Sequence, residues 1–237
     1  TMFGKILVAN RGEIACRVMR TARRLGIRTV AVYSEADRNA PHVEMADEAV
    51  AIGPSPAAQS YLVIDRILEA CRATGAEAVH PGYGFLSERA AFAEALAGAG
   101  ITFIGPNAAA IEAMGDKIES KRRADAAGVS TVPGGKGALE TAEEALAIAE
   151  EIGYPVMIKA SAGGGGRGIK IAENADELAK LVSQARSEAQ AAFGDGSLYM
   201  EKLVRNARHI EVQVLGDGTD AVHCFERECS MQRRRQK

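Results

Sequence analysis

Residues 156–168 read VMIKASAGGGGRG, an apolar strand pattern that carries one cation, Lys159, and runs into a glycine-rich loop. The four consecutive glycines of this loop are Gly163, Gly164, Gly165 and Gly166. Each glycine costs about 0.5–1 kcal/mol relative to alanine, so such a run indicates a function that needs close backbone approach to an anion. A second strand pattern follows at 169–172, and we expect a β-hairpin whose loop is a flap over a triphosphate. The alternative is a surface loop that binds no ligand.

The loop differs from two familiar phosphate-binding patterns. A Walker A loop ends in Gly-Lys before Ser or Thr and leads into a helix, whereas this loop leads into a strand. A Rossmann fingerprint needs three glycines in the first βα turn, which contains only Gly12. Lys159 points away from the strand face of Val156 and Ile158, and a partly buried ammonium needs an anionic partner. We expect phosphate as that partner, with a solvated lysine as the alternative.

The first 110 residues repeat a strand–helix pattern. Strands are expected over 5–9, 29–33, 49–52, 78–80 and 101–104. An amphipathic helix is expected after Gly12, and further helices are expected over 61–74 and 88–97. The apolar stripe of the first helix consists of Ile14, Val18, Ala22 and Leu25. Repeated βα units with short turns predict a Rossmann-like domain with an open parallel sheet.

The second half of the chain begins with a helical pattern over 111–127 that carries Lys117. A cation near a helix N-terminus opposes the helix dipole, which is a weak indication of an anion nearby. Further helices are expected over 141–152 and 175–192, and strands over 198–203, 209–215 and 221–226. The last three strands predict the start of an antiparallel sheet with exposed edges, so we expect the protein to continue beyond it.

The composition is that of an ordinary globular protein, with 47% hydrophobic and 25% charged residues and a formal charge of −2. This balance, and an aromatic content of 5% without tryptophan, give no reason to expect nucleic acid as a partner. No apolar run approaches the roughly 20 residues that span a bilayer, and we expect a cytoplasmic protein without a membrane partner. Four cysteines without metal-site spacing are expected to be reduced thiols, namely Cys16, Cys71, Cys224 and Cys229.

Together these segments resemble the N-terminal half of a biotin carboxylase, an ATP-grasp ligase. The stretches that carry the resemblance run in family order along the whole chain and are KILVANRGEIACRV, ADEAV, SYL, HPGYGFLSE, FIGP, MGDK, YPVMIKASAGGGGRG, YMEK, RHIEVQV and ERECSMQRRRQK. The resemblance implies an α/β fold with a Rossmann-like N-terminal (pre-ATP-grasp) domain at 1–115 and a helical connector at 116–130. An ATP-grasp lid at 131–203 and the beginning of the C-terminal ATP-grasp domain at 204–237 would follow.

The resemblance also implies an activity. ATP activates bicarbonate as carboxyphosphate, and the carboxyl group then passes to N1 of biotin held on a carrier domain. The implied cofactors are ATP and Mg²⁺ or Mn²⁺, and the implied partners are a biotin carboxyl carrier domain, a carboxyltransferase subunit and a second copy in a homodimer. The motifs are most similar to those of the biotin carboxylase component of bacterial acyl-CoA carboxylases of the acetyl, propionyl or methylcrotonyl type. Pyruvate and urea carboxylases share these motifs and stay open as alternatives.

The family's site residues carry over motif by motif. Lys117 and Lys159 would hold ATP phosphates beneath the glycine loop. The adenine-side hinge would consist of Glu201, Lys202, Leu203 and Val204. His209 would contact the ribose region, and Gln232 would lie near the nucleotide. Lys237 would face bicarbonate or the transferring phosphoryl group as a catalytic cation.

Arg235 occupies a position in the nucleotide site where many members have histidine, and arginine does not titrate near neutrality. The family's metal-binding glutamates, catalytic base, and bicarbonate and biotin arginines lie beyond residue 237. We therefore expect no metal ligand within this chain and no carboxylation of biotin by the chain alone. Two other classes stay open: another ATP-grasp ligase, such as a carbamoyl-phosphate or purine-pathway enzyme, and a non-catalytic ATP-binding module.

Overall fold

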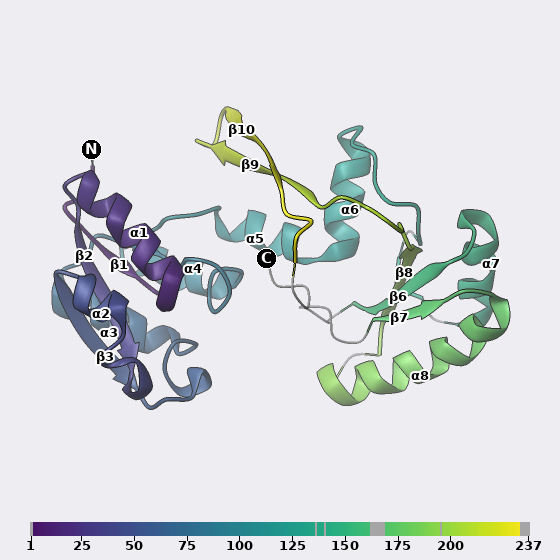
Figure 1. Ribbon diagram of the computed structural model, residues 1–237, viewed down its shortest axis with the longest axis horizontal. Helices are drawn as coiled ribbons and strands as arrows, with labels where there is room; N and C mark the ends of the chain where they lie inside the picture. The colour runs from purple at the N-terminus through teal and green to yellow at the C-terminus, as the bar shows by residue number, and fades with distance from the viewer. Residues whose placement is uncertain (1, 136, 140, 162–168, 195, 233–237) are drawn as a thin grey trace. The chain divides into compact units, whose positions relative to one another are not determined.

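The computed structural model describes residues 2–135, 137–139, 141–161, 169–194 and 196–232. The chain folds into two compact units, Thr1–Ser120 and Lys121–Lys237, here named unit 1 and unit 2. Figure 1 traces the chain through the helices and strands of both units.

Unit 1 contains a five-stranded parallel sheet in the order β3-β2-β1-β4-β5 (Figure 1). Its strands are β1 (Lys5–Val8), β2 (Arg28–Ser34), β3 (Glu48–Gly53), β4 (Ala78–His80) and β5 (Thr102–Phe103). Its helices are α1 (Gly12–Arg24), α2 (Pro41–Met45), α3 (Ile64–Thr74), α4 (Ala90–Gly98) and α5 (Ala108–Gly115), with 3-10 turns at Glu35–Asp37 and Ala57–Gln59. Parallel strands joined by helices confirm the predicted Rossmann-like α/β architecture.

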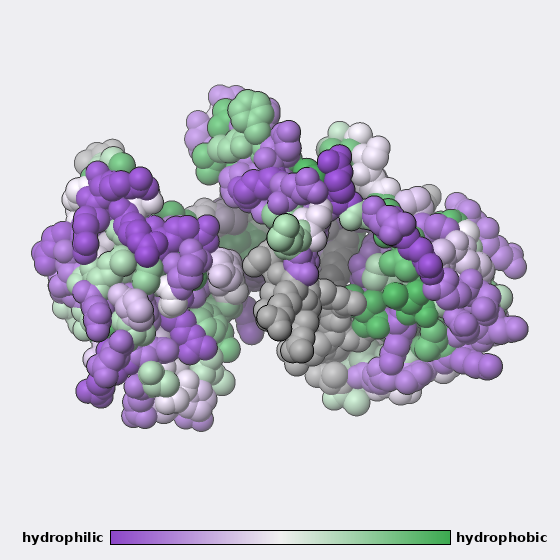
Figure 2. All heavy atoms as spheres, viewed as in Figure 1, coloured by the Kyte–Doolittle hydropathy of each residue, from purple (hydrophilic) through white to green (hydrophobic). Residues whose placement is uncertain are grey.

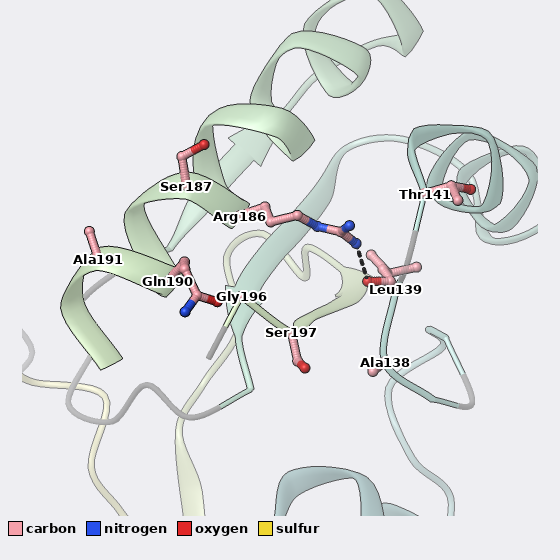
Figure 3. Close-up of a pocket in the computed structure, with 9 residues that line it drawn as sticks. All are labelled: Ala138, Leu139, Thr141, Arg186, Ser187, Gln190, Ala191, Gly196 and Ser197. Carbon is pink, nitrogen blue, oxygen red and sulfur yellow. Dashed lines mark hydrogen bonds between the residues drawn. The ribbon is translucent and has the colours of Figure 1, made fainter. Parts of the chain in front are cut away.

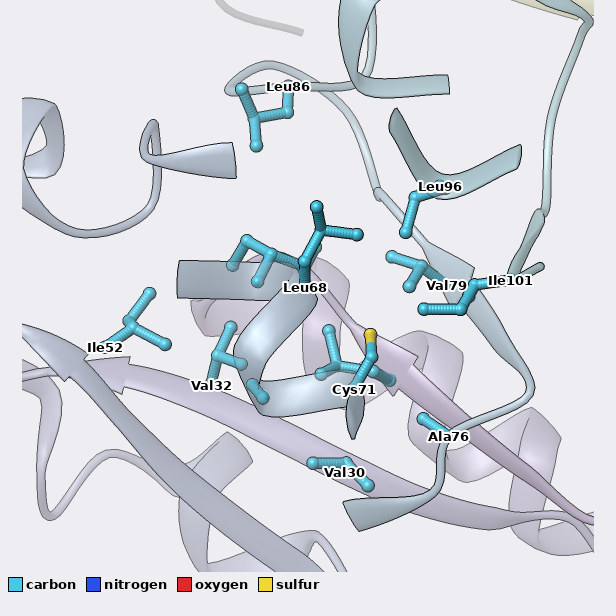
Figure 4. Packing of buried hydrophobic residues seen from close by; sticks show 14 of the residues in the cluster. Val30, Val32, Ile52, Leu68, Cys71, Ala76, Val79, Leu86, Leu96 and Ile101 are labelled. Carbon is cyan, nitrogen blue, oxygen red and sulfur yellow. The ribbon is translucent and has the colours of Figure 1, made fainter. Parts of the chain in front are cut away.

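The sheet of unit 1 is buried on both faces because successive side chains of a strand point to opposite sides. Leu7 of β1 belongs to a cluster with Leu68 of α3 and Leu96 of α4 (Figure 4). Its neighbour Val8 packs in a separate cluster that includes Met19 of α1. Helices on both faces are typical of an all-parallel sheet.

The buried stripe of α1 differs from the predicted one. Ile14 and Val18 are only half-buried, and Leu25 is 54% exposed beyond the helix end. The buried residues of α1 are Ala15, Cys16, Met19 and Ala22. Two of these four are alanines, whose small side chains let the helix approach the sheet closely, so the helix is rotated away from the bulkier stripe.

The single helix predicted over 111–127 is in fact two helices, α5 and α6 (Lys117–Ala126). Asp116 between them has an extended backbone, with φ −82° and ψ 118°. Its Oδ1 accepts hydrogen bonds from the N–H groups of Ile118 and Glu119, each at 2.8 Å. An aspartate side chain that binds these donors competes with helix continuation and caps the next helix instead.

Unit 2 is built on a three-stranded antiparallel sheet in the order β7-β6-β8. The strands are β6 (Val156–Ala160), β7 (Lys170–Ala172) and β8 (Leu198–Lys202). Helices α7 (Ala142–Ile152) and α8 (Ala175–Phe193) share an apolar core with this sheet (Figure 1). Asn174 caps α8, since its side chain accepts a hydrogen bond from the Glu177 N–H at 3.0 Å. The predicted β6–β7 hairpin is confirmed, and most of its loop lies outside the described residues.

Strands β9 (Ile210–Gly216) and β10 (Ala221–Glu228) form a separate antiparallel pair with an irregular register between His223 and Glu226. The predicted three-stranded start of an antiparallel sheet is wrong, because β8 pairs with β6 rather than with β9. Apolar side chains gather over this hairpin (Figure 2), and Phe225 is 70% exposed.

Two features concern the chain as a whole. None of the four cysteines, all of which lie in the described ranges, forms a disulfide, and Cys16 and Cys71 are buried. Among the helices of the described ranges, none combines the length and the apolar character that crossing a membrane requires.

Candidate functional site

The face of the β7-β6-β8 sheet opposite α7 and α8 carries the predicted phosphate-binding lysine. Along β6, Val156, Ile158 and Ala160 are buried, whereas Met157 and Lys159 are half-buried. Lys159 lies directly opposite Tyr199 of β8, and Met157 lies opposite Glu201. Opposed residues of antiparallel strands share a face, so the set named here the Lys159 face consists of Met157, Lys159, Tyr199 and Glu201.

Lys159 and Glu201 form an ion pair through Nζ and Oε1 on this face. Their side chains are 22% and 16% exposed, so the pair is partly shielded from solvent. The other carboxylate oxygen of Glu201, Oε2, accepts a hydrogen bond from the Tyr199 hydroxyl at 2.8 Å. Within the protein, the anionic partner of Lys159 is therefore a carboxylate rather than the predicted phosphate, and a phosphate would have to compete with this carboxylate.

Tyr199 is the most deeply buried member of the Lys159 face, at 4% exposure. Burial, together with the hydrogen bond to Glu201, raises the pKa of the Tyr199 phenol well above its usual value. The ammonium of Lys121 lies 5.6 Å from the centre of the Tyr199 ring, within cation–π range. Tyr199 is therefore a protonated donor at neutral pH.

The predicted adenine-side hinge lies at the end of β8. The N–H of Lys202 donates to the Pro133 carbonyl at 2.8 Å, and the N–H of Leu203 donates to the Pro155 carbonyl at 3.0 Å. The Lys202 ammonium donates to the Tyr154 carbonyl at 2.6 Å. These bonds fix the backbone of the hinge immediately beside Glu201.

His209 and Gln232 lie together at the open end of the β9–β10 hairpin. The Cys229 N–H donates to the His209 carbonyl at 2.7 Å, and the Gln232 Nε2 donates to the Cys229 carbonyl at 2.7 Å. The His209 N–H donates to Ser230 Oγ at 2.9 Å. The contacts described for the predicted site residues thus join them in two groups, Lys159 with Glu201 and His209 with Gln232.

Several predicted site residues lie outside the part of the chain that the structure describes. Lys117 is the first residue of α6, in agreement with its predicted place near a helix N-terminus, but its side chain is not described. The residues wholly outside the described ranges are Gly163, Gly164, Gly165, Gly166, Arg235 and Lys237.

A hollow of about 890 Å³ in unit 2 contains none of the predicted site residues. It lies between α8, the segment just before β8 and the segment that leads into α7 (Figure 3). The guanidinium of Arg186 reaches across it and donates to the Leu139 carbonyl at 2.9 Å. Hydroxyls of Thr141, Ser187 and Ser197 also line it. Arg186 closes this part of the unit by linking α8 to the opposite segment.

A loop within the HPGYGFLSE stretch, to which no site role was assigned from the sequence, lies at the carboxyl edge of the parallel sheet in unit 1. The side chain of Asn10, after β1, is 4% exposed and donates to the carbonyls of Pro81 and Tyr83 after β4, each at 2.8 Å. Gly82 has φ +65°, and a Cβ there would come within 2.7 Å of Asn10 Nδ2. Ligands of open α/β sheets bind outside the carboxyl ends of the strands, where the strand order reverses. Asn10 therefore fixes the loop after β4 at the edge of the sheet where ligands of such folds commonly bind.

The Lys159 face is suited to a phosphate-bearing ligand. Its ammonium lies on the strand that leads into the glycine-rich segment and can donate charge-assisted hydrogen bonds to phosphate oxygens. Within the described residues, no group of three or more His, Cys, Asp or Glu side chains is arranged to hold a metal ion.

Sequence reasoning missed Tyr199, although a signal was present. Tyr199 and Glu201 are two residues apart on one strand and must share a face. The register that places Lys159 opposite Tyr199 and brings it to Glu201, 42 residues further along the chain, however, depends on long-range pairing.

Two family models together match nearly the whole chain. The biotin carboxylase N-terminal domain matches residues 2–111, and the carbamoyl-phosphate synthase L chain ATP-binding domain matches residues 116–237.

Curated relatives include the propionyl-CoA carboxylase alpha chain of Ruegeria pomeroyi, 61% identical over 237 residues. The match covers 100% of this chain and 35% of that relative. The biotin carboxylase of Pseudomonas aeruginosa is 55% identical over 238 residues, which cover 100% of this chain and 53% of the relative. The chain thus spans between about a third and a half of these relatives.

Solved structures with the same fold include the biotin carboxylase–β,γ-ATP complex from Campylobacter jejuni, with a TM-score of 0.92 and 50% identity. This match covers 100% of the chain and 53% of that protein. The biotin carboxylase domain dimer of the Hydrogenobacter thermophilus 2-oxoglutarate carboxylase, in complex with MgADP, ADP and bicarbonate, has a TM-score of 0.91 and 55% identity. That match covers 100% of the chain and 52% of the domain.

Proposed function

The chain belongs to the biotin carboxylase family, and we propose that it supplies the nucleotide-binding part of an enzyme that carboxylates biotin with bicarbonate and ATP. The observation that carries the proposal is the ATP-binding domain match over 116–237, which contains the whole Lys159 face. An ATP-grasp ligase of this family forms carboxyphosphate from ATP and bicarbonate before the carboxyl group passes to N1 of biotin. The reaction class is ATP-dependent ligation.

The chain's own cations would act on the phosphates. We assign Lys159 to the phosphate groups because its ammonium projects from β6 where the strand leads into the glycine-rich segment. Lys117 would join it, and the flap that closes over the phosphates would consist of Gly163, Gly164, Gly165 and Gly166. Fixed cations stabilise the charge that develops on a transferring phosphoryl group without reorganising, and this is the main protein contribution to such catalysis.

The adenine and ribose would be held by the second group of predicted residues. The hinge at Glu201, Lys202, Leu203 and Val204 would meet the adenine edge through backbone groups. The N–H groups of Lys202 and Leu203 already bond to Pro133 and Pro155, so other backbone groups of the hinge would make this contact. The family resemblance assigns His209 to the ribose region, and we place Gln232 beside it because both residues bond to the backbone of Cys229. Arg235 would contact the nucleotide, and Lys237 would act on bicarbonate.

Mg²⁺, or Mn²⁺ in its place, would accompany the nucleotide and neutralise phosphate charge. In biotin carboxylases the glutamates that bind this metal follow the segment that corresponds to residue 237. We therefore propose that the chain alone does not carboxylate biotin. We further propose the domain division of the sequence analysis, with a lid at 131–203 that includes the β7-β6-β8 sheet.

The acceptor of the carboxyl group is proposed to be an acyl-CoA of the acetyl, propionyl or methylcrotonyl type, reached through a biotin carrier domain and a carboxyltransferase subunit. Similarity to a propionyl-CoA carboxylase alpha chain supports this choice. Similarity to a 2-oxoglutarate carboxylase and a pyruvate carboxylase keeps a 2-oxo acid as the alternative. A homodimer in the intact, cytoplasmic enzyme is proposed from the dimeric structural neighbour.

The experiment that tests the function measures ADP release from MgATP by the full-length protein, with and without bicarbonate and free biotin. We expect release to need bicarbonate and to rise with biotin, and we expect the 237-residue chain alone to show no biotin-stimulated release. A second ligase remains in competition, because the match over 116–237 is to a carbamoyl-phosphate synthase domain. Bicarbonate-dependent release by the full-length protein that ignores biotin would favour that ligase and refute our proposal.

A further inference from the structure

The carboxylate of Glu201 is held by two donors on different oxygens. Lys159 Nζ bonds to Oε1, and the Tyr199 hydroxyl bonds to Oε2 at 2.8 Å. Tyr199 and Glu201 are on one strand, β8, whereas Lys159 is on the neighbouring strand β6. The tyrosine bond therefore lies within β8 and does not depend on the position of the lysine side chain on β6.

Binding of a phosphate to Lys159 creates an electrostatic problem for Glu201. The lysine must leave the carboxylate or share its ammonium, yet Glu201 is only 16% exposed. A shielded carboxylate that loses its cation and has no other partner is strongly destabilising. Another hydrogen-bond donor must therefore stay bonded to the Glu201 carboxylate while Lys159 turns toward the phosphate.

Tyr199 can be this donor. The residue is only 4% exposed, and the Lys121 ammonium lies 5.6 Å from the centre of its ring, so the surrounding atoms leave the hydroxyl little room to turn away. Hydrogen bonds to an ionised acceptor are about twice as strong as neutral ones. A phenol that stays protonated donates to the carboxylate at every physiological pH.

We propose that Tyr199 is a positioning residue that retains the Glu201 carboxylate when Lys159 exchanges this partner for a nucleotide phosphate. The inference rests on the proposed function, since it takes Lys159 as the phosphate ligand. Tyr199 touches no substrate in this account and acts only through Glu201. Its hydroxyl lowers the free energy of the exchange, so its removal weakens phosphate binding.

The test measures the Kd of MgADP by calorimetry in the full-length protein. Tyr199→Phe keeps the ring and removes the hydroxyl, and we expect it to weaken binding about 3- to 10-fold. Tyr154→Phe is the matched control, because the Tyr154 hydroxyl is buried in unit 2 without a hydrogen-bond partner among the described residues. We expect the control to change the Kd by less than about twofold.

A double-variant cycle separates positioning from a merely structural role. Glu201→Gln removes the charge that Tyr199 retains, so Tyr199→Phe in that background should weaken MgADP binding by less than about twofold. An equal loss in both backgrounds, or no loss in the native background, would overturn the inference. Lys159→Ala tests the underlying function separately: if it leaves the Kd unchanged, the phosphate assignment of Lys159 fails, whereas a loss there without a Tyr199 effect refutes only the inference.

Discussion

Replacement of Lys159 by alanine is the perturbation that bears most directly on the proposed nucleotide site. The Lys159 side chain is 22% exposed, and its ammonium pairs with the Glu201 carboxylate. A charge-assisted hydrogen bond contributes about 1.5–3 kcal/mol, and each 1.4 kcal/mol is a factor of ten in affinity. We therefore expect Lys159→Ala to weaken MgADP binding about 10- to 150-fold.

The loss has two parts that the structure allows to be separated. Lys159→Ala removes the attraction to phosphate and also leaves the Glu201 carboxylate without its cation, where it repels the phosphates. The double variant Lys159→Ala with Glu201→Gln removes only the attraction, and we expect it to recover part of the lost affinity, about threefold or more.

The assay is a calorimetric titration with MgADP, and thermal unfolding checks that each variant is folded. Lys170→Ala is the matched control, because Lys170 of β7 also forms an ion pair, with Glu188 of α8 at 3.0 Å. Lys170 lies opposite Ile158, on the face covered by the helices. An affinity change of less than twofold in Lys159→Ala, or an equal loss in Lys170→Ala, would refute the reasoning.

Three further predictions concern the stability and the loops of the two units. Burial acts to raise the pKa of Asp37, but hydrogen bonds from Tyr61, Arg11 and Ser34 outweigh it and hold the pKa below its usual value of 3.8. Asp37→Asn should therefore lower the free energy of unfolding, measured in urea at pH 7, by about 1–3 kcal/mol. The difference between the two proteins should shrink as the pH falls below about 4. A carboxyl group whose pKa is lowered in the folded state stabilises the fold only while it is ionised. A difference that is constant from pH 7 to pH 3 would contradict the assignment. Leu178→Ala should cost about 2–5 kcal/mol in the same assay, since Leu178 of α8 is fully buried in the core of unit 2. Asn10→Ala leaves the carbonyls of Pro81 and Tyr83 without their donor, so amide hydrogen exchange of 82–85 should accelerate at least about tenfold, whereas unchanged protection would show that the loop is held by other contacts.

Local patterns in the sequence were sufficient for most elements of the fold. Strand β6 lies in the apolar pattern that begins at Val156, and helix α3 ends at Thr74 as predicted, where Gly75 takes the left-handed conformation typical of a C-cap. These features depend on neighbours in the chain. The family resemblance is confirmed by the two matching domain models.

The errors arose where tertiary packing or side-chain competition decided the outcome. Helix α1 turns Ala15 rather than Ile14 toward the sheet, since close packing on the sheet favours a small side chain. The helix predicted over 111–127 is interrupted by Asp116, whose carboxylate takes two backbone N–H groups. Strand β8 pairs with β6 rather than β9, and no local pattern specifies which strand is the partner.

The candidate site was only partly predictable for the same reason. The sequence indicated Lys159 from its place before the glycine run, but Glu201 entered only as part of the hinge. The ion pair between the two, and the Tyr199 bond behind it, depend on the antiparallel register of β6 and β8. Such a register is set by long-range packing, which the sequence of either strand alone does not contain.

The most direct test of the nucleotide site is a crystal structure of the full-length protein with MgADP. We expect a phosphate oxygen at about 2.7–3.2 Å from Lys159 Nζ. We also expect the Tyr199 hydroxyl to remain bonded to Glu201. A nucleotide bound with its phosphates away from the Lys159 face, with Lys159 still paired with Glu201 alone, would refute the assignment of Lys159 to the phosphates.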